Sequence, residues 1–109
     1  MNIVELKNWA FDYDIEERTK NSFYKMLENY KVDNPEEFNN VFKNIRIEEL
    51  SLQMHTISLN LGNWPECSYN TVSASMWIRH KGKQIASYKT LYTFDGEAED
   101  DFFDIFKVV

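Results

Sequence analysis

Residues 71–104 read TVSASMWIRHKGKQIASYKTLYTFDGEAEDDFFD, and this stretch decides the fold that we expect. Two runs in which polar and apolar residues alternate, Thr71–His80 and Gln84–Phe94, flank the turn residues Lys81-Gly82-Lys83. Alternation with a period of two is typical of strands, and a short link containing glycine indicates a hairpin. The stretch therefore predicts a long antiparallel β-hairpin.

The acidic segment Asp95–Asp104 follows this hairpin directly. Asp95-Gly96 is a turn signal that ends the second strand. We expect a short C-terminal helix at Glu99–Phe106, whose three phenylalanines would be buried against the rest of the fold. A strand ending at Val109 is the alternative for the same residues.

The period of two begins before the hairpin. One alternating set of apolar residues ends at Met54, and a second set in the opposite phase begins at Ile57. A change of phase within one strand predicts a β-bulge, here near His55-Thr56. The loop Gly62–Glu66 ends this strand.

The two hairpin strands predict a sheet with two different faces. Val72, Ala74, Met76 and Ile78 point to one aliphatic face that suits a cover of helices. The other face holds aromatic, hydroxyl and charged groups, and we assign its exposed aromatic residues as Trp77, Tyr88 and Tyr92. Alternatively, the N-terminal helices cover these aromatic residues.

Three helix signals precede the strands. Asn2 and Glu5 form an N-cap pair for a helix over Asn2–Tyr13, and Asp14–Glu17 resembles a second capping box that opens a helix to about Tyr30. Asn34-Pro35 predicts a third helix over Pro35–Asn44. The first two segments are either separate helices or one bent helix.

Helices followed by a run of strands indicate an α+β fold. We expect the N-terminal helices to pack on one face of an antiparallel meander of three or four strands. A chain of 109 residues is long enough for one core and too short for two, so residues 1–109 are predicted to form a single domain.

The charge balance limits the classes of partner that the protein is expected to bind. The chain has 18 acidic and 12 basic residues, a net charge of −6. A negative surface repels phosphate backbones and anionic lipid, which argues against nucleic-acid and membrane binding and favours a basic partner. One cysteine, no signal peptide and no apolar run of membrane-spanning length predict a cytoplasmic protein.

No motif predicts a catalytic, metal or cofactor site. Cys67 with His55 or His80 is the only pairing of a nucleophile with a base. Covalent catalysis also needs an oxyanion site, and no metal-ligand spacing such as Cys-x-x-Cys is present. We therefore expect no enzyme activity and no bound cofactor.

The partner-binding surface that we predict combines acids and aromatic residues. Six acids occur between the second hairpin strand and Lys107 without a base among them, and their mutual repulsion would be relieved by a partner's cations. Aromatic residues beside them would act as desolvated anchors. The predicted residues are Asp95, Glu97, Glu99, Asp100, Asp101 and Asp104, with Trp77, Tyr88 and Tyr92 as anchors.

In its general build the chain resembles the immunity proteins of bacterial polymorphic-toxin and contact-dependent growth inhibition systems. The similarity lies in the small, acidic, cysteine-poor α+β pattern and in the strand and acidic segment from Ile85-Ala86-Ser87-Tyr88 to Phe94–Phe102. The resemblance implies a non-enzymatic inhibitor that binds a cognate toxin with a basic site, often a nuclease.

Two alternatives from other functional classes stay open. The first is a small enzyme or small-molecule-binding domain whose pocket lies between helices and sheet and contains His55, His80 or Cys67. The second is a subunit of a homo-oligomer that associates through the aromatic sheet face. The sequence leaves the oligomeric state undecided.

Overall fold

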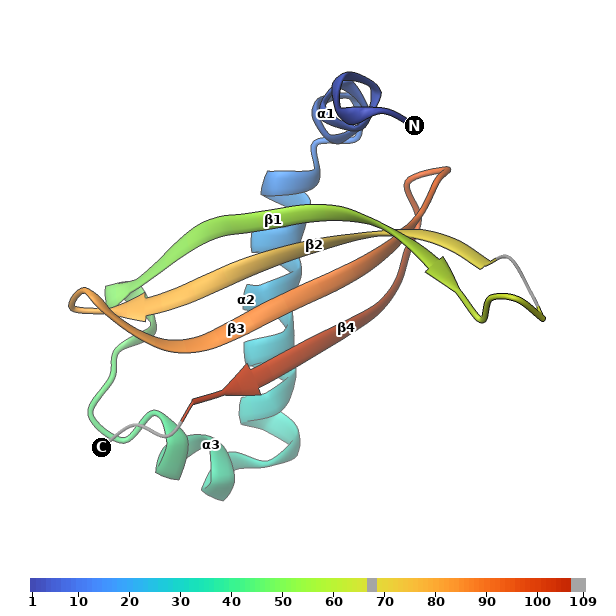
Figure 1. The fold of residues 1–109 in the computed structure, drawn as a ribbon. Helices are drawn as coiled ribbons and strands as arrows, with labels where there is room; N and C mark the ends of the chain where they lie inside the picture. The colour runs from blue at the N-terminus through green and yellow to red at the C-terminus, as the bar shows by residue number, and fades with distance from the viewer. Residues whose placement is uncertain (67–68, 107–109) are drawn as a thin grey trace.

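A computed structural model describes residues 1–66 and 69–106, and Cys67 and the predicted strand end at Val109 lie outside these ranges. In the described residues, helices precede strands along the chain (Figure 1). The helices are α1 (Ile3–Asp12), α2 (Ile15–Asp33) and α3 (Pro35–Val41), followed by a single 3-10 turn at Ile47–Glu49. The strands are β1 (Leu50–Gly62), β2 (Tyr69–His80), β3 (Lys83–Thr93) and β4 (Ala98–Ile105).

The four strands form one antiparallel sheet in the order β1-β2-β3-β4, which is the predicted meander. The hairpin turns at Lys81 and Gly82, whose φ angles of 50° and 80° are those of a two-residue turn that matches strand twist. The predicted bulge is confirmed, because the pairing of β1 with β2 shifts register between Met54 and Thr56.

The helix starts follow local sequence signals only in part. Asn2 and Glu5 form the predicted capping box, in which the Glu5 amide donates to Asn2 Oδ1 at 2.9 Å. The capping box predicted at Asp14 is wrong: Asp14 has a left-handed φ of 54° and its side chain makes no cap bond. This backbone reversal separates α1 from α2. The third helix begins at Pro35 as predicted but ends at Val41 instead of Asn44.

The C-terminal helix predicted at Glu99–Phe106 is wrong, since these residues lie in and just after β4. The alternative prediction, a strand in this segment, is correct. β4 pairs with β3 so that Phe103 lies opposite Tyr88 on the side of the helices. There the Phe103 ring contacts those of Phe23, Tyr30 and Phe42. Partial burial of Phe103 together with backbone pairing to β3 explains why the strand is formed.

The core lies between the helices and one sheet face, which α2 crosses in Figure 1. Val72, Ala74, Met76 and Ile78 have no exposed surface, so the predicted aliphatic face is confirmed. Phe23 and Leu27 of α2 pack on the half of the sheet near α3, and Leu6, Trp9 and Ile15 pack on the other half. The opposite sheet face carries no helix in the described residues, and we call it the open face.

None of the helices described here combines the length and the apolar character that a membrane crossing requires.

Candidate functional site

The six predicted acids are all exposed, and they lie in the turn before β4 and along both faces of β4. Asp95 and Glu97 flank the turn between β3 and β4. Asp100 and Asp104 lie opposite Leu91 and Ser87 on the open face. Asp101 lies opposite Thr90, on the helix side of β4. Glu99 lies at the register shift, between Ala98 and Asp100. The acids therefore form an edge of the sheet and not a single turn.

None of these acids forms a salt bridge in the part of the chain that the structure describes. The acid–base contacts there lie elsewhere, at Lys20–Glu16, Arg46–Glu48 and His80–Glu49. Like charges spaced along one strand repel one another, and solvent and salt screen only part of that repulsion. A cationic partner would relieve it.

Phe102 lies between Asp100 and Asp104 on the open face, and the sequence reasoning did not select it. Its side chain is 47% exposed. Lys89, opposite it on β3, places Nζ 5.0 Å from the ring centroid. A ring flanked by two carboxylates provides both a π face and charge for a cation. The alternation of Asp100, Phe102 and Asp104 indicates this arrangement once the segment is read as a strand.

A groove of about 520 Å³ adjoins Phe102. It is lined on the open face by side chains from three neighbouring strands, Ser75 of β2, Ser87 and Lys89 of β3, and Phe102 and Asp104 of β4. Hydroxyl, ammonium, aromatic and carboxylate groups thus meet in one concavity. Such a mixture suits a peptide or protein side chain that carries both charge and apolar surface.

Two of the three predicted aromatic anchors are not exposed. Tyr88 and Tyr92 are 1% and 0% exposed, because the register places them opposite Met76 and Val72 on the helix-covered face. Their prediction as exposed residues is wrong, and the alternative that helices cover them is correct. Trp77 does lie on the open face, half-buried beside His55, with the two rings stacked at 4.5 Å.

Tyr88 and Tyr92 instead join β3 to β4 and to α2, respectively. The Tyr88 hydroxyl donates to Asp101 Oδ2 at 2.7 Å, and the Tyr92 hydroxyl shares a hydrogen bond with Thr19 Oγ1 at 2.9 Å. Burial, with the nearby Asp101 carboxylate, raises the pKa of Tyr88 well above the ordinary tyrosine value. Tyr88 therefore keeps its proton and fixes Asp101 on β4.

The turn that leads into β4 is fixed by the N-terminal helices. Trp9 Nε1 donates to the Phe94 carbonyl at 2.8 Å, and Arg18 Nη2 donates to the Gly96 carbonyl at 2.7 Å. Gly96 has a φ of 84°, and a Cβ there would collide with the Tyr13 ring. We call these contacts of Trp9, Tyr13 and Arg18 the turn clamp. The clamp sets where the acidic edge begins.

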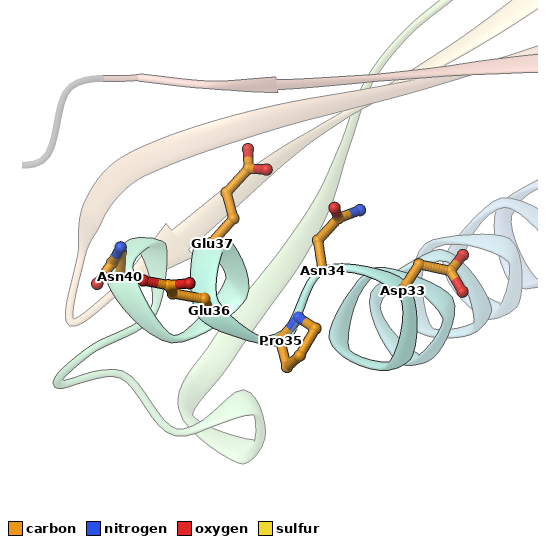
Figure 2. A pocket seen from close by; sticks show the side chains of 6 residues that line it. All are labelled: Asp33, Asn34, Pro35, Glu36, Glu37 and Asn40. Atoms are coloured by element: carbon orange, nitrogen blue, oxygen red, sulfur yellow. The ribbon is translucent and has the colours of Figure 1, made fainter.

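A second acidic hollow, of about 470 Å³, lies where α2 meets α3. Figure 2 shows its carboxylates pointing away from one another, with Glu37 directed toward the sheet and Asp33 on the far side of Pro35. Among residues 1–66 and 69–106, no group of three His, Cys, Asp or Glu side chains has the arrangement to hold a metal ion. This hollow is an exposed helix junction.

The two histidines lie on different strands and in different surroundings. His55 lies on the open face of β1 against Trp77, while His80 lies on β2 with Nε2 3.7 Å from Glu49 Oε2. Neither histidine lines the two hollows described above. Cys67, the third residue of the enzyme alternative, lies outside the described ranges.

Comparison with known proteins identified no relative of this chain. No protein-family model matches the chain, and searches of curated proteins and of solved structures found no match.

Proposed function

We propose that this protein is a non-enzymatic inhibitor of the immunity type, which binds a cognate toxin in the cytoplasm through its acidic sheet edge. We call this edge the β4 acidic surface and define it as Asp95, Glu97, Glu99, Asp100, Phe102 and Asp104. The observation that carries the proposal is the exposed Phe102 between two carboxylates on the open face.

The chemistry of this surface favours arginine on the partner. A guanidinium can lie flat on an aromatic ring while its N–H groups donate to neighbouring carboxylates. The contact of Lys89 Nζ with the Phe102 ring, 5.0 Å from its centroid, supports the proposal that this ring accepts a cation. Both partners are desolvated in such a contact, as interface hot spots require.

A nuclease toxin fits this surface by charge. Its substrate cleft is basic because it binds phosphates, and a row of carboxylates can occupy the same cleft. Attraction between the net −6 chain and such a cleft would accelerate association and make it depend on salt. Trp77, which lies two strands from β4 on the open face, extends the contact toward β2.

The test uses the product of the reading frame directly upstream of the gene as the binding probe. We expect its expression to arrest growth and co-expression of this chain to restore growth. In surface plasmon resonance, kon should fall steeply as salt rises. An association rate that does not change with salt would contradict binding through the β4 acidic surface.

Two triple variants separate this surface from net charge. Glu97→Gln, Glu99→Gln and Asp104→Asn neutralise three of the five acids of the β4 acidic surface, while Asp12→Asn, Glu28→Gln and Glu36→Gln neutralise three exposed acids on the helices. Both variants have the same net charge. We expect kon to fall at least about tenfold in the first and to change little in the second. Equal effects, or full growth protection by the first variant, would overturn the assignment.

A further inference from the structure

The two edges of the sheet differ in charge. β1 and β4 each have one strand neighbour in the described residues, so each leaves one side of its backbone without a strand partner. β4 carries four acids among its eight residues, whereas the thirteen residues of β1, LSLQMHTISLNLG, include no Lys, Arg, Asp, Glu or Pro. Charges and prolines are the usual protection of an edge strand against pairing. β1 lacks both.

The β1 edge also borders exposed apolar surface. A groove of about 530 Å³ lies between α1, the start of α2 and β1, and Met54 and Ile57 form its β1 side. Ile3 and Phe11 line it from α1 and are 78% and 73% exposed. Figure 1 shows α1 on the β1 side of the sheet, at the opposite edge from β4. Exposed apolar surface beside an unpaired strand is typical of an interface.

We propose that a second copy of this chain occupies the β1 edge, forming a two-fold symmetric dimer through antiparallel β1–β1 pairing. The inference is independent of the toxin hypothesis. A strand of thirteen residues gives a seam of about 44 Å. In a pair centred on Thr56, the middle of β1, the groove at Met54 and Ile57 lies close to the two-fold axis. Ile3 and Phe11 of each copy then face the other copy.

The uncharged β1 edge is compatible with a second copy as the occupant. Two β1 strands meet without like-charge repulsion between strand residues, and the charged residues that line the adjoining groove, Lys7, Asp14 and Glu16, include both signs. The β4 acidic surface lies three strand spacings from β1, about 14 Å at ~4.8 Å per spacing, which exceeds the Debye length of about 8 Å at physiological salt. The acids of both copies would therefore stay at the outer edges of an eight-stranded sheet, where they remain free for another partner.

Sedimentation velocity over micromolar to millimolar concentrations tests the proposal. We expect the mass to rise with concentration from the 13.1 kDa of one chain to twice that value. In hydrogen exchange followed by mass spectrometry, β1 peptides should gain protection with concentration and β4 peptides should not. A single-chain mass at every concentration would overturn the dimer, and so would β1 protection that appears only with a different protein.

Matched variants locate the seam. Thr56→Lys places like charges opposite each other across the two-fold axis, and Asn39→Lys adds the same charge on α3. We expect the first to weaken the dimer at least about tenfold and the second to leave it unchanged. Phe11→Ser on α1, with the equally exposed Val32→Ser on α2 as its control, gives the same contrast if Thr56→Lys misfolds. A dimer that both β1-side variants leave unchanged while they stay folded by circular dichroism would place the interface elsewhere.

Discussion

Gly96 illustrates how one residue determines the start of the acidic edge. It combines a positive φ with close contact to the Tyr13 ring, and its carbonyl accepts from Arg18. A side chain at this position would be destabilising for two reasons, the strain of the positive φ and the collision with the Tyr13 ring. The turn therefore has little freedom to move relative to α1 and α2.

Gly96→Ala should lower the free energy of unfolding by about 2–4 kcal/mol, since left-handed strain and overpacking each contribute about 1–2 kcal/mol or more. Gly82→Ala is the matched control, because Gly82 has a similar φ of 80° but open space around its Cβ position. The control should lose only about 1 kcal/mol. Urea titration measures both free energies of unfolding. Equal losses would show that the contact with Tyr13 does not contribute to the effect of Gly96→Ala.

Tyr88 makes the free energy of unfolding fall as the pH rises into the alkaline range. Its pKa is raised in the folded state by burial, so the native protein keeps a proton that the unfolded chain loses near the ordinary tyrosine pKa of about 10. The contribution is complete below that pH and is lost as pH rises above it. Wild-type stability should therefore fall above about pH 10 with an extra slope of up to ~1.4 kcal/mol per pH unit.

Tyr88→Phe removes this extra slope and also the hydrogen bond to Asp101, a loss of about 1 kcal/mol at neutral pH. Urea titrations of both proteins at neutral and alkaline pH measure the difference. Tyr24→Phe, at a residue that is 39% exposed, serves as the control and should keep the wild-type slope. Parallel pH profiles for wild type and Tyr88→Phe would contradict the assignment.

Side-chain interactions close in sequence were predictable and distant ones were not. The capping pair Asn2–Glu5 involves residues three positions apart, so its pattern can be recognised in the sequence. Thr19 and Tyr92 meet across 73 residues, and no local pattern indicates their bond. Tyr88 could have been placed, however. The predicted three-residue turn, with His80 opposite Gln84, already puts Tyr88 across from Met76 on the aliphatic face.

At the scale of elements, β4 shows how tertiary contacts decide an ambiguous segment. Phe102, Phe103 and Phe106 fit a helical spacing as well as an extended one, and the acids before them suit a helix start. The open edge of β3 and the ring contacts of Phe103 favour the strand. The strand separates Phe102 from Phe103 onto opposite faces, and this separation creates the exposed ring of the β4 acidic surface.

Arg18→Met should loosen the start of β4 without unfolding α2. The change keeps much of the side-chain volume but removes the donor to the Gly96 carbonyl and the cation 5.1 Å from the Tyr92 ring. We expect faster amide exchange at residues 94–98, where one amide, that of Glu97, also donates to Thr93 Oγ1. Exchange in β2 should stay unchanged. Lys25→Met, at an exposed position further along α2, is the control.

For the whole molecule, the α+β class and the meander followed from the sequence because periodicity reports which residues face a core. The helix signals up to Asn44 and the alternating residues around Met54 separated helices from sheet. The relative placement of the helices did not follow, since Trp9 and Arg18 reach residues 94 and 96 through contacts that no pattern encodes. The burial of Tyr88 and Tyr92 was missed, whereas Trp77 lies on the open face as expected.

The uneven charge of the molecule predicts a stability that rises with salt. Added NaCl screens the repulsion among the acids of the β4 acidic surface, so the free energy of unfolding should increase by a few tenths of a kcal/mol between low and physiological ionic strength. The Glu97→Gln, Glu99→Gln, Asp104→Asn variant should lose most of this response. The Asp12→Asn, Glu28→Gln, Glu36→Gln variant should keep more of it, and identical responses would show that only net charge matters.

The turn clamp has a consequence for synthesis on the ribosome. The helices that hold the β3–β4 turn are made first, yet their bonds to Phe94 and Gly96 span 85 and 78 residues. These bonds cannot form before most of the chain has been translated and has emerged from the exit tunnel. Until then Trp9 and Arg18 are without these acceptors, so the turn clamp forms only after residues 94 and 96 have emerged.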